Sequence, residues 1–252
     1  MRISLLDELA RNGNIFTVDD ARSISGVRDE VLWVMLSRME SGGWIERIER
    51  GKYMIIPLGA EKGKYTLHEF VIASLLADPF CIAYWSALNF HGLTEQIPRT
   101  IFVQTTSRRK RPNITVFGVD YQIKRIKREK YFGIRNNWIE GIRINITDPE
   151  KTIVDCLDKP QFCGGLIEVA KALNERKFNT NKLIDYSKRI NNSGVIRRLG
   201  YLNDLLELDI DVPKIDTRSY LHLDPSMPHQ GGKNAKWRLI INIDELDLET
   251  IK

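Results

Sequence analysis

The first fifty-odd residues carry the pattern that most restricts the fold. Leu5, Leu6 and Leu9 share one face of a helix expected over residues 3–10, and Asn12-Gly13 is typical of a helix end. Thr17 precedes a second short helix, with acids in its first turn, where the positive end of the helix dipole favours them. A third helix is expected over residues 28–40. Its core-facing stripe consists of Leu32, Met35, Leu36 and Met39.

The residues after this third helix alternate in polarity as strands do. Ser41-Gly42-Gly43 ends the helix, and residues 44–56 read as two strands around a Gly-containing turn. Three short helices followed by a hairpin are typical of a winged helix-turn-helix, whose third helix enters the DNA major groove. The alternative is a small helical domain that binds protein. The pattern favours DNA.

The expected DNA contacts follow from the same spacing. With the apolar stripe turned inward, the outward side of the third helix presents Arg28, Trp33, Ser37 and Arg38. The hairpin, or wing, offers cations for the DNA backbone or minor groove, namely Arg47, Arg50 and Lys52.

Composition is that of an ordinary globular protein, with 42% hydrophobic and 28% charged residues in a chain of 252. No apolar run approaches the roughly 20 residues of a membrane span. The N-terminus lacks an apolar signal core. Three cysteines without CxxC spacing favour reduced thiols over disulfides or zinc, and so a cytoplasmic protein without membrane contact.

The net charge of +5 is unevenly distributed. Residues 1–63 hold nine Lys and Arg against ten Asp and Glu, whereas residues 99–130 hold ten against two, a balance of +8. Such a stretch predicts a nucleic-acid contact, to operator DNA or to RNA, although a solvated hairpin is the alternative. We define the basic patch as Arg108, Arg109, Lys110, Arg111, Lys124, Arg125, Lys127, Arg128 and Lys130, the last five on an expected strand.

The remainder of the chain mixes helices and strands, so the fold class is α+β: an N-terminal winged helix-turn-helix followed by a mixed α/β domain. We expect the first domain over residues 1–57, a linker over 58–65 and the second domain over 66–252. Expected helices cover 66–77, 82–93, 166–174, 180–189 and 193–206, with another starting at Asp148. Expected strands cover 101–106, 114–117, 121–128 and 142–146. A tail pairs 220–223 with 237–242 around a turn at Gly231-Gly232.

A candidate catalytic cluster lies at Asp148-Pro149-Glu150-Lys151 with Asp155. Two acids and a lysine resemble a nuclease metal site, but such sites draw their ligands from two strands. Here Asp148 is better placed as an N-cap, and Lys151 and Asp155 are one helical turn apart and able to pair at the surface.

His91 is expected to pack or cap, and Tyr84, Trp85 and Phe90 to lie in the core. Gly164-Gly165 is a weak anion-site signal. We predict no catalytic residues, no metal and no cofactor.

Several segments of the sequence resemble motifs of the AbiEi family, antitoxins of the AbiE type IV toxin–antitoxin systems, and of their stand-alone regulator relatives. These segments are residues 84–94 (YWSALNFHGLT), 101–103 (IFV) leading into Arg108-Arg109-Lys110, 131–133 (YFG), 147–160 (TDPEKTIVDCLDKP), 163–165 (CGG), and 223–225 (LDP) with 236–239 (KWRL). With the winged helix, they span nearly the full length.

The resemblance implies a DNA-binding N-terminal domain that represses its own operon. It also implies a C-terminal antitoxin domain that opposes a nucleotidyltransferase-like toxin. The expected partners are therefore operator DNA and such a toxin or its RNA substrate. Two alternatives remain: a nuclease-like nucleic-acid-processing enzyme targeted by the winged helix, and a stand-alone transcriptional regulator without a toxin.

Overall fold

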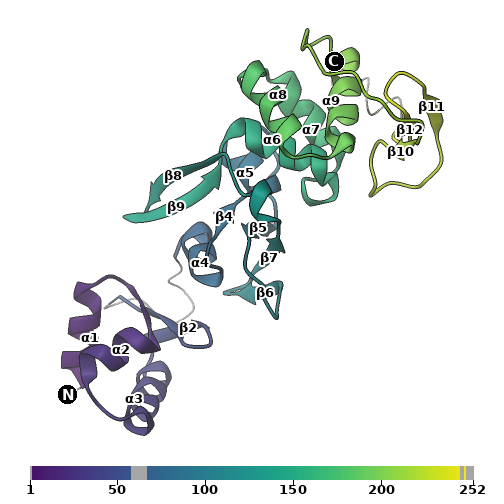
Figure 1. The fold of residues 1–252 in the computed structure, drawn as a ribbon. Helices are drawn as coiled ribbons and strands as arrows, with labels where there is room; N and C mark the ends of the chain where they lie inside the picture. Colours follow the sequence, from purple (N-terminus) through teal and green to yellow (C-terminus); the bar gives the residue numbers. More distant parts are fainter. Residues whose placement is uncertain (1, 58–66, 245–246, 248–252) are drawn as a thin grey trace.

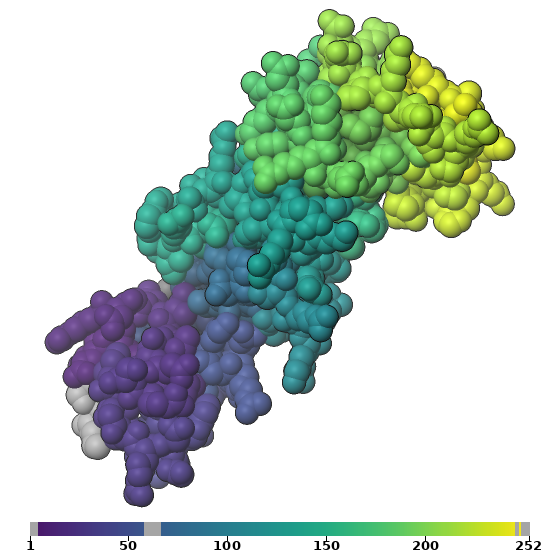
Figure 2. Space-filling view, viewed as in Figure 1, coloured from purple at the N-terminus to yellow at the C-terminus, as the bar shows by residue number. Residues whose placement is uncertain are grey.

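The computed structural model describes residues 2–57, 67–244 and 247. The chain is elongated, as Figure 1 shows: the winged helix occupies one end, a six-stranded sheet the middle, and a group of helices with a small C-terminal sheet the other end. In the space-filling view (Figure 2) the winged helix is a separate lobe that touches the middle part. The expected linker, 58–65, lies outside the described residues.

The N-terminal part contains the three helices and the hairpin that the pattern predicts, together with one further short strand. They are α1 (Arg2–Arg11), β1 (Ile15–Thr17), α2 (Val18–Ser25), α3 (Asp29–Ser41), β2 (Ile45–Glu49) and β3 (Lys52–Ile55). The strands form an antiparallel sheet in the order β1-β3-β2. Leu9, Ala21, Leu32, Leu36 and Ile45 are at most 1% exposed, so the three helices and the sheet enclose one small core.

Local signals explain where these elements begin. The side chain of Thr17 accepts a hydrogen bond from the backbone N–H of Asp20 at 3.1 Å, and the Asp20 carboxylate accepts from the backbone N–H of Thr17 at 2.7 Å. This reciprocal capping box satisfies two N–H groups that the first turn of α2 leaves unpaired. The wing turns at Gly51, whose φ of +79° an L side chain rarely adopts.

The middle of the molecule is a mixed sheet in the order β6-β7-β5-β4-β9-β8. Its strands are β4 (Cys81–Ile82), β5 (Thr100–Thr105), β6 (Asn113–Val116), β7 (Val119–Arg125), β8 (Ile134–Ile139) and β9 (Ile142–Thr147). Helix α4 (Glu69–Leu76) packs on one face. Helices α5 (Tyr84–Phe90) and α6 (Pro149–Asp158) cover the other face.

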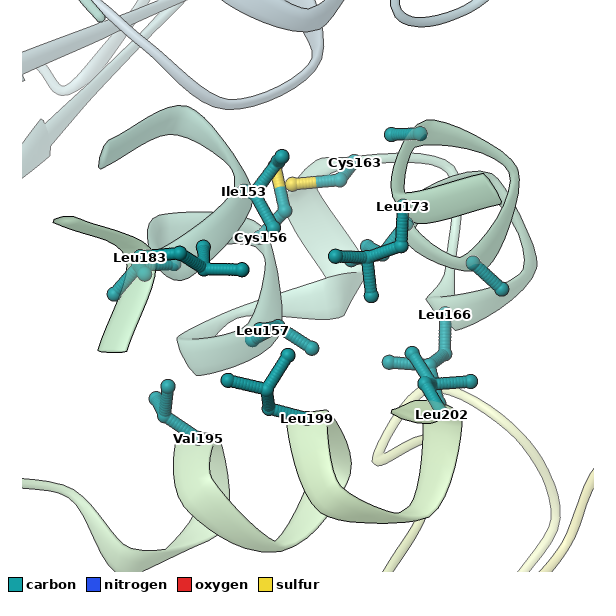
Figure 3. Packing of buried hydrophobic residues seen from close by; sticks show 14 of the residues in the cluster. Ile153, Cys156, Leu157, Cys163, Leu166, Leu173, Leu183, Val195, Leu199 and Leu202 are labelled. Carbon is teal, nitrogen blue, oxygen red and sulfur yellow. The ribbon is translucent and has the colours of Figure 1, made fainter. Parts of the chain in front are cut away.

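Four helices build the second large core. Helix α6 contacts α7 (Leu166–Asn174), α8 (Thr180–Arg189) and α9 (Ser193–Leu206). Figure 3 shows Leu157 of α6 facing Leu199 of α9, and Cys156 of α6 beside Cys163. All of the residues that it labels are fully buried. Replacing one of these leucines by alanine should cost about 2–5 kcal/mol of unfolding free energy, because the cavity does not close.

The C-terminal part adds a small sheet to α9. Its strands are β10 (Leu221–His222), β11 (Gly232–Asn234) and β12 (Leu239–Ile241), in the order β10-β12-β11. The indole of Trp237 lies against Gly200, where a Cβ atom would overlap the ring, and its Nε1 donates to Asp204 at 2.6 Å. A larger residue at Gly200 would therefore displace this sheet from α9.

The structure confirms the α+β class and the winged helix, and corrects several expected elements. Residues 81–82 form a strand inside the sheet, so the helix expected over residues 82–93 starts only at Tyr84. The basic strand ends at Arg125, and Arg128–Lys130 form a 3-10 turn. Gly232 lies in a strand instead of a turn, and β10 pairs with β12 in parallel. β1 and β8 were not expected at all.

Candidate nucleic-acid interface

Helix α3 presents its outward side to solvent. Arg28 is the N-cap residue of α3, but its guanidinium can only donate hydrogen bonds and makes no cap hydrogen bond to the first-turn N–H groups. Arg28, Ser37 and Arg38 are exposed, and Trp33 is 45% exposed. The four side chains expected on this side of the helix therefore lie there, beside the exposed Val31 and Val34. Their contact with DNA remains a prediction.

Helices α2 and α3 are joined by an arginine that sequence reasoning missed. Arg22 pairs with Asp29 through its Nε and the carboxylate Oδ1 at 2.8 Å, and it also contacts Asp19. Because Asp29 is the first residue of α3, this bridge links the two helices. All three groups are exposed, so the bridge adds little stability.

The three basic residues of the wing differ in their surroundings: two are exposed, and one has partners within the protein. Arg47 and Arg50 are exposed. Lys52 instead turns toward the rest of the molecule: its Nζ lies 2.9 Å from Glu49 Oε1 and also contacts the carbonyl oxygen of Leu75 in α4. The ammonium of Lys52 thus already has two acceptors within the protein, whereas the side chains of Arg47 and Arg50 point to solvent.

Glu49 connects the wing to the basic patch. Its Oε2 lies 2.5 Å from Nη2 of Arg109, and Nε of Arg109 donates to the carbonyl oxygen of Arg111 at 3.0 Å. Ile48 and Met54 of the wing are buried in the same core cluster as α4 and the sheet. The wing is consequently docked on the middle of the molecule, with the loop at residues 106–112 beside it.

The basic patch divides in the same way. Six of its nine members are exposed: Arg108, Lys110, Arg111, Arg125, Lys127 and Arg128. The other three are half-buried and held by the protein. Arg109 binds Glu49, Lys124 lies over the ring of Phe162 at 4.2 Å, and Lys130 bonds Asp158 at 2.8 Å. Burial lowers the pKa of Lys124. Sheet pairing ends at Arg125, so Lys127 lies outside the strand, and Arg128 and Lys130 lie in the 3-10 turn that follows.

The acidic cluster at the start of α6 is structural. Asp148 caps the helix, accepting from the backbone N–H of Lys151 at 2.9 Å. Lys151 and Asp155 do pair, but in the interior and not at the surface: Lys151 is 0% and Asp155 3% exposed. Gln104 of β5, which sequence reasoning missed, donates to Asp155 at 2.8 Å.

A second lysine closes this network from α8. Lys182 lies 2.9 Å from Asp148 and 2.8 Å from Glu150. Burial opposes ionisation of Glu150, yet the hydrogen bonds from Lys182 and from the backbone N–H of Asn179 hold its pKa below the ordinary value. Within the described residues, no group of three His, Cys, Asp or Glu side chains is placed to hold a metal ion.

The remaining single residues have structural partners. Nε2 of His91 lies 2.6 Å from the carbonyl oxygen of Thr147, and burial lowers the pKa of this imidazole. The N-terminus of α7 after Gly164-Gly165 is occupied by the protein's own carboxylate, since Leu166 N–H donates to Asp224 at 2.7 Å. Tyr84 is buried and Trp85 half-buried, but Phe90 is 40% exposed and was wrongly expected in the core.

Across the described ranges, no helix combines the length and the apolar content needed to cross a membrane. No curated protein matches the chain. The crystal structure of the RV2827C protein from Mycobacterium tuberculosis superposes with a TM-score of 0.68 at 16% identity, covering 98% of this chain and 92% of that one. This likeness supports the fold.

Two sequence families match successive parts of the chain. Residues 4–56 match "Transcriptional regulator, AbiEi antitoxin", and residues 81–207 match "AbiEi antitoxin C-terminal domain". The first match covers the winged helix, and the second covers the sheet and helices α5 to α9. Because these two matches cover most of the chain, the protein belongs to the AbiEi family of antitoxins and transcriptional regulators.

Proposed function

We propose that the protein is a cytoplasmic autorepressor that binds duplex operator DNA through α3, the wing and the loop at residues 106–112. The observation that carries this proposal is the docking of Glu49 on Arg109. It holds the exposed cations of the loop beside those of the wing. Long basic side chains on the wing and on the neighbouring loop suit the phosphates of a duplex whose major groove holds α3.

The test uses arginines of α3. Arg28→Ala and Arg38→Ala should each weaken binding to the promoter DNA of the protein's own operon by about 1–3 kcal/mol, the value of a bidentate arginine–guanine contact. Arg11→Ala, at the exposed end of α1, is the matched control and should bind as the wild type does. Gel-shift titration measures all three. Wild-type affinity for both α3 variants would remove this helix from the interface.

We also propose that the protein acts as the antitoxin to a nucleotidyltransferase-like toxin, without catalysis of its own. Family membership supports an antitoxin, and the neighbouring gene would identify the toxin. Co-expression with that gene should restore growth that the toxin alone arrests. Failure to restore growth while operator binding is intact would favour a stand-alone regulator.

The alternative of a nuclease-like enzyme is disfavoured by the burial of Lys151. A lysine that steadies an attacking water has to reach substrate, whereas the ammonium of Lys151 is enclosed and bound to Asp155. Incubation of the purified protein with DNA and tRNA, with and without magnesium, should leave both intact. Metal-dependent cleavage would support the enzyme.

A further inference from the structure

The hairpin formed by β8 and β9 carries an unusual aromatic residue. Trp138 of β8 is 73% exposed, although an indole is among the side chains that gain most from burial. The hairpin projects from the sheet in Figure 1, and β8 is its edge strand. The indole is therefore held out by two paired strands.

The neighbours of Trp138 follow from the strand register. Trp138 lies directly opposite Arg143, and Asn136 lies opposite Asn145. Since side chains of directly paired residues point to the same side, and alternate residues share a face, these four residues lie on one face of the hairpin. Arg143 is exposed, and its Nε donates to Oδ1 of Asn136 at 2.8 Å. This bond orients the guanidinium beside the indole.

The chemistry of this face distinguishes two kinds of partner. A protein interface surrounds a buried anchor with further apolar side chains. Around Trp138 the same face offers two amides and a guanidinium, and no carboxylate. The one acid of the hairpin, Glu140 at its turn, accepts a hydrogen bond from the backbone N–H of His68 at 3.2 Å. An isolated aromatic plane next to a cation and amides fits an unpaired base and its phosphate.

We propose that the β8–β9 hairpin binds single-stranded nucleic acid, with one base stacked on Trp138 and the adjoining phosphate paired with Arg143. The amide NH2 group of Asn136, whose oxygen accepts from Arg143, borders the base edge. The amide of Asn145 instead donates to the carbonyl oxygen of Phe80 at 3.2 Å. The surface is separate from α3 and from the loop at residues 106–112, and the proposal does not depend on operator recognition. A base inside a duplex cannot stack there, because its faces are covered by its neighbours.

The test measures fluorescence anisotropy of a labelled oligouridylate and of an oligothymidylate of equal length, with the full chain. Trp138→Ala should weaken binding about 5- to 150-fold, the range found for removing one stacking aromatic. Trp138→Phe, which keeps an aromatic plane, should retain most of the affinity. Arg143→Gln should weaken binding and also flatten its dependence on salt. The ratio of the two oligonucleotides distinguishes RNA from DNA as the source of the strand.

A crossed control separates this surface from the winged helix. Trp33→Ala on α3 should leave single-strand binding unchanged, and Trp138→Ala should leave binding to the duplex promoter DNA unchanged. Because Trp138 is mostly exposed, its alanine variant should melt at the wild-type temperature. Equal single-strand affinity of wild type and Trp138→Ala would overturn the proposal and leave the hairpin to a protein partner. An equal loss of duplex binding by Trp138→Ala would overturn it as well.

Discussion

At the scale of single residues, Lys151 and Asp155 show that an ion pair with ordinary i,i+4 helical spacing can be buried in the core. Two oppositely charged side chains four residues apart on a helix usually meet in water and contribute a few tenths of a kcal/mol. Here β5 and Gln104 cover them, so neither side chain reaches solvent. A charge left without its partner in such a place has a large desolvation cost.

This burial leads to a prediction about stability. Asp155→Asn removes the countercharge of an enclosed ammonium and should lower the free energy of unfolding by about 3–5 kcal/mol. Glu175→Gln removes the acid of an exposed pair with Lys177 and should cost less than about 1 kcal/mol. Urea titration of the two variants provides the comparison. Equally small effects would show that water reaches Lys151.

At the scale of elements, the helices with a clear apolar periodicity were the most predictable. Helices α7, α8 and α9 have the expected bounds, because clear periodicity and, for α8 and α9, Asn caps mark them. The apolar run at 81–93 has no such mark, so the two-residue strand β4 was merged into the helix that follows it. β8 was missed because Asn136 and Asn137 interrupt any alternating pattern. Only tertiary pairing with β9 makes it a strand.

The site was less predictable than the fold, since sequence spacing cannot show which cations the protein already uses. Lys52, Arg109, Lys124 and Lys130 resemble their exposed neighbours in sequence, yet each has an internal partner. Those partners lie between 3 and 60 residues away along the chain, and most of them are brought close only by the docking of the wing and the packing of α6. Only the three-dimensional structure therefore distinguishes the basic residues that are exposed from those that have internal partners.

The wing allows a prediction at this scale. Replacing Arg47 and Arg50 together by alanine should weaken binding to different DNA sequences alike. It should also reduce the slope of log affinity against log salt by about 0.9 for each phosphate that the wing no longer neutralises. Lys52→Met is the matched control: its ammonium is held by Glu49 and by the carbonyl of Leu75, so the slope should stay unchanged. An unchanged slope in the double variant would show that the wing does not touch phosphate.

At the scale of the whole molecule, the docking of the wing joins two parts with opposite charge. The first 63 residues have nine basic residues against ten acidic, whereas the basic excess lies in residues 99–130. Ile48 and Met54 bury their side chains in the core beneath the sheet, so the winged helix and the sheet share a hydrophobic cluster. A winged helix cut from the chain would expose this surface. The contribution of the basic loop is therefore best measured in the full-length protein.

The last prediction concerns that loop. Replacing Arg108, Lys110 and Arg111 by alanine should weaken operator binding strongly at low salt, and the difference from the wild type should shrink as salt rises, because released counterions drive these contacts. A second triple variant, Lys188, Lys214 and Arg218 to alanine, removes the same charge from exposed positions toward the other end of the molecule. It should bind nearly as the wild type does. Equal losses in both variants would mean that only the long-range potential of the protein matters. An unchanged loop variant would assign the loop to another partner, and growth rescue from the toxin by the same variant would then show whether antitoxin activity needs it.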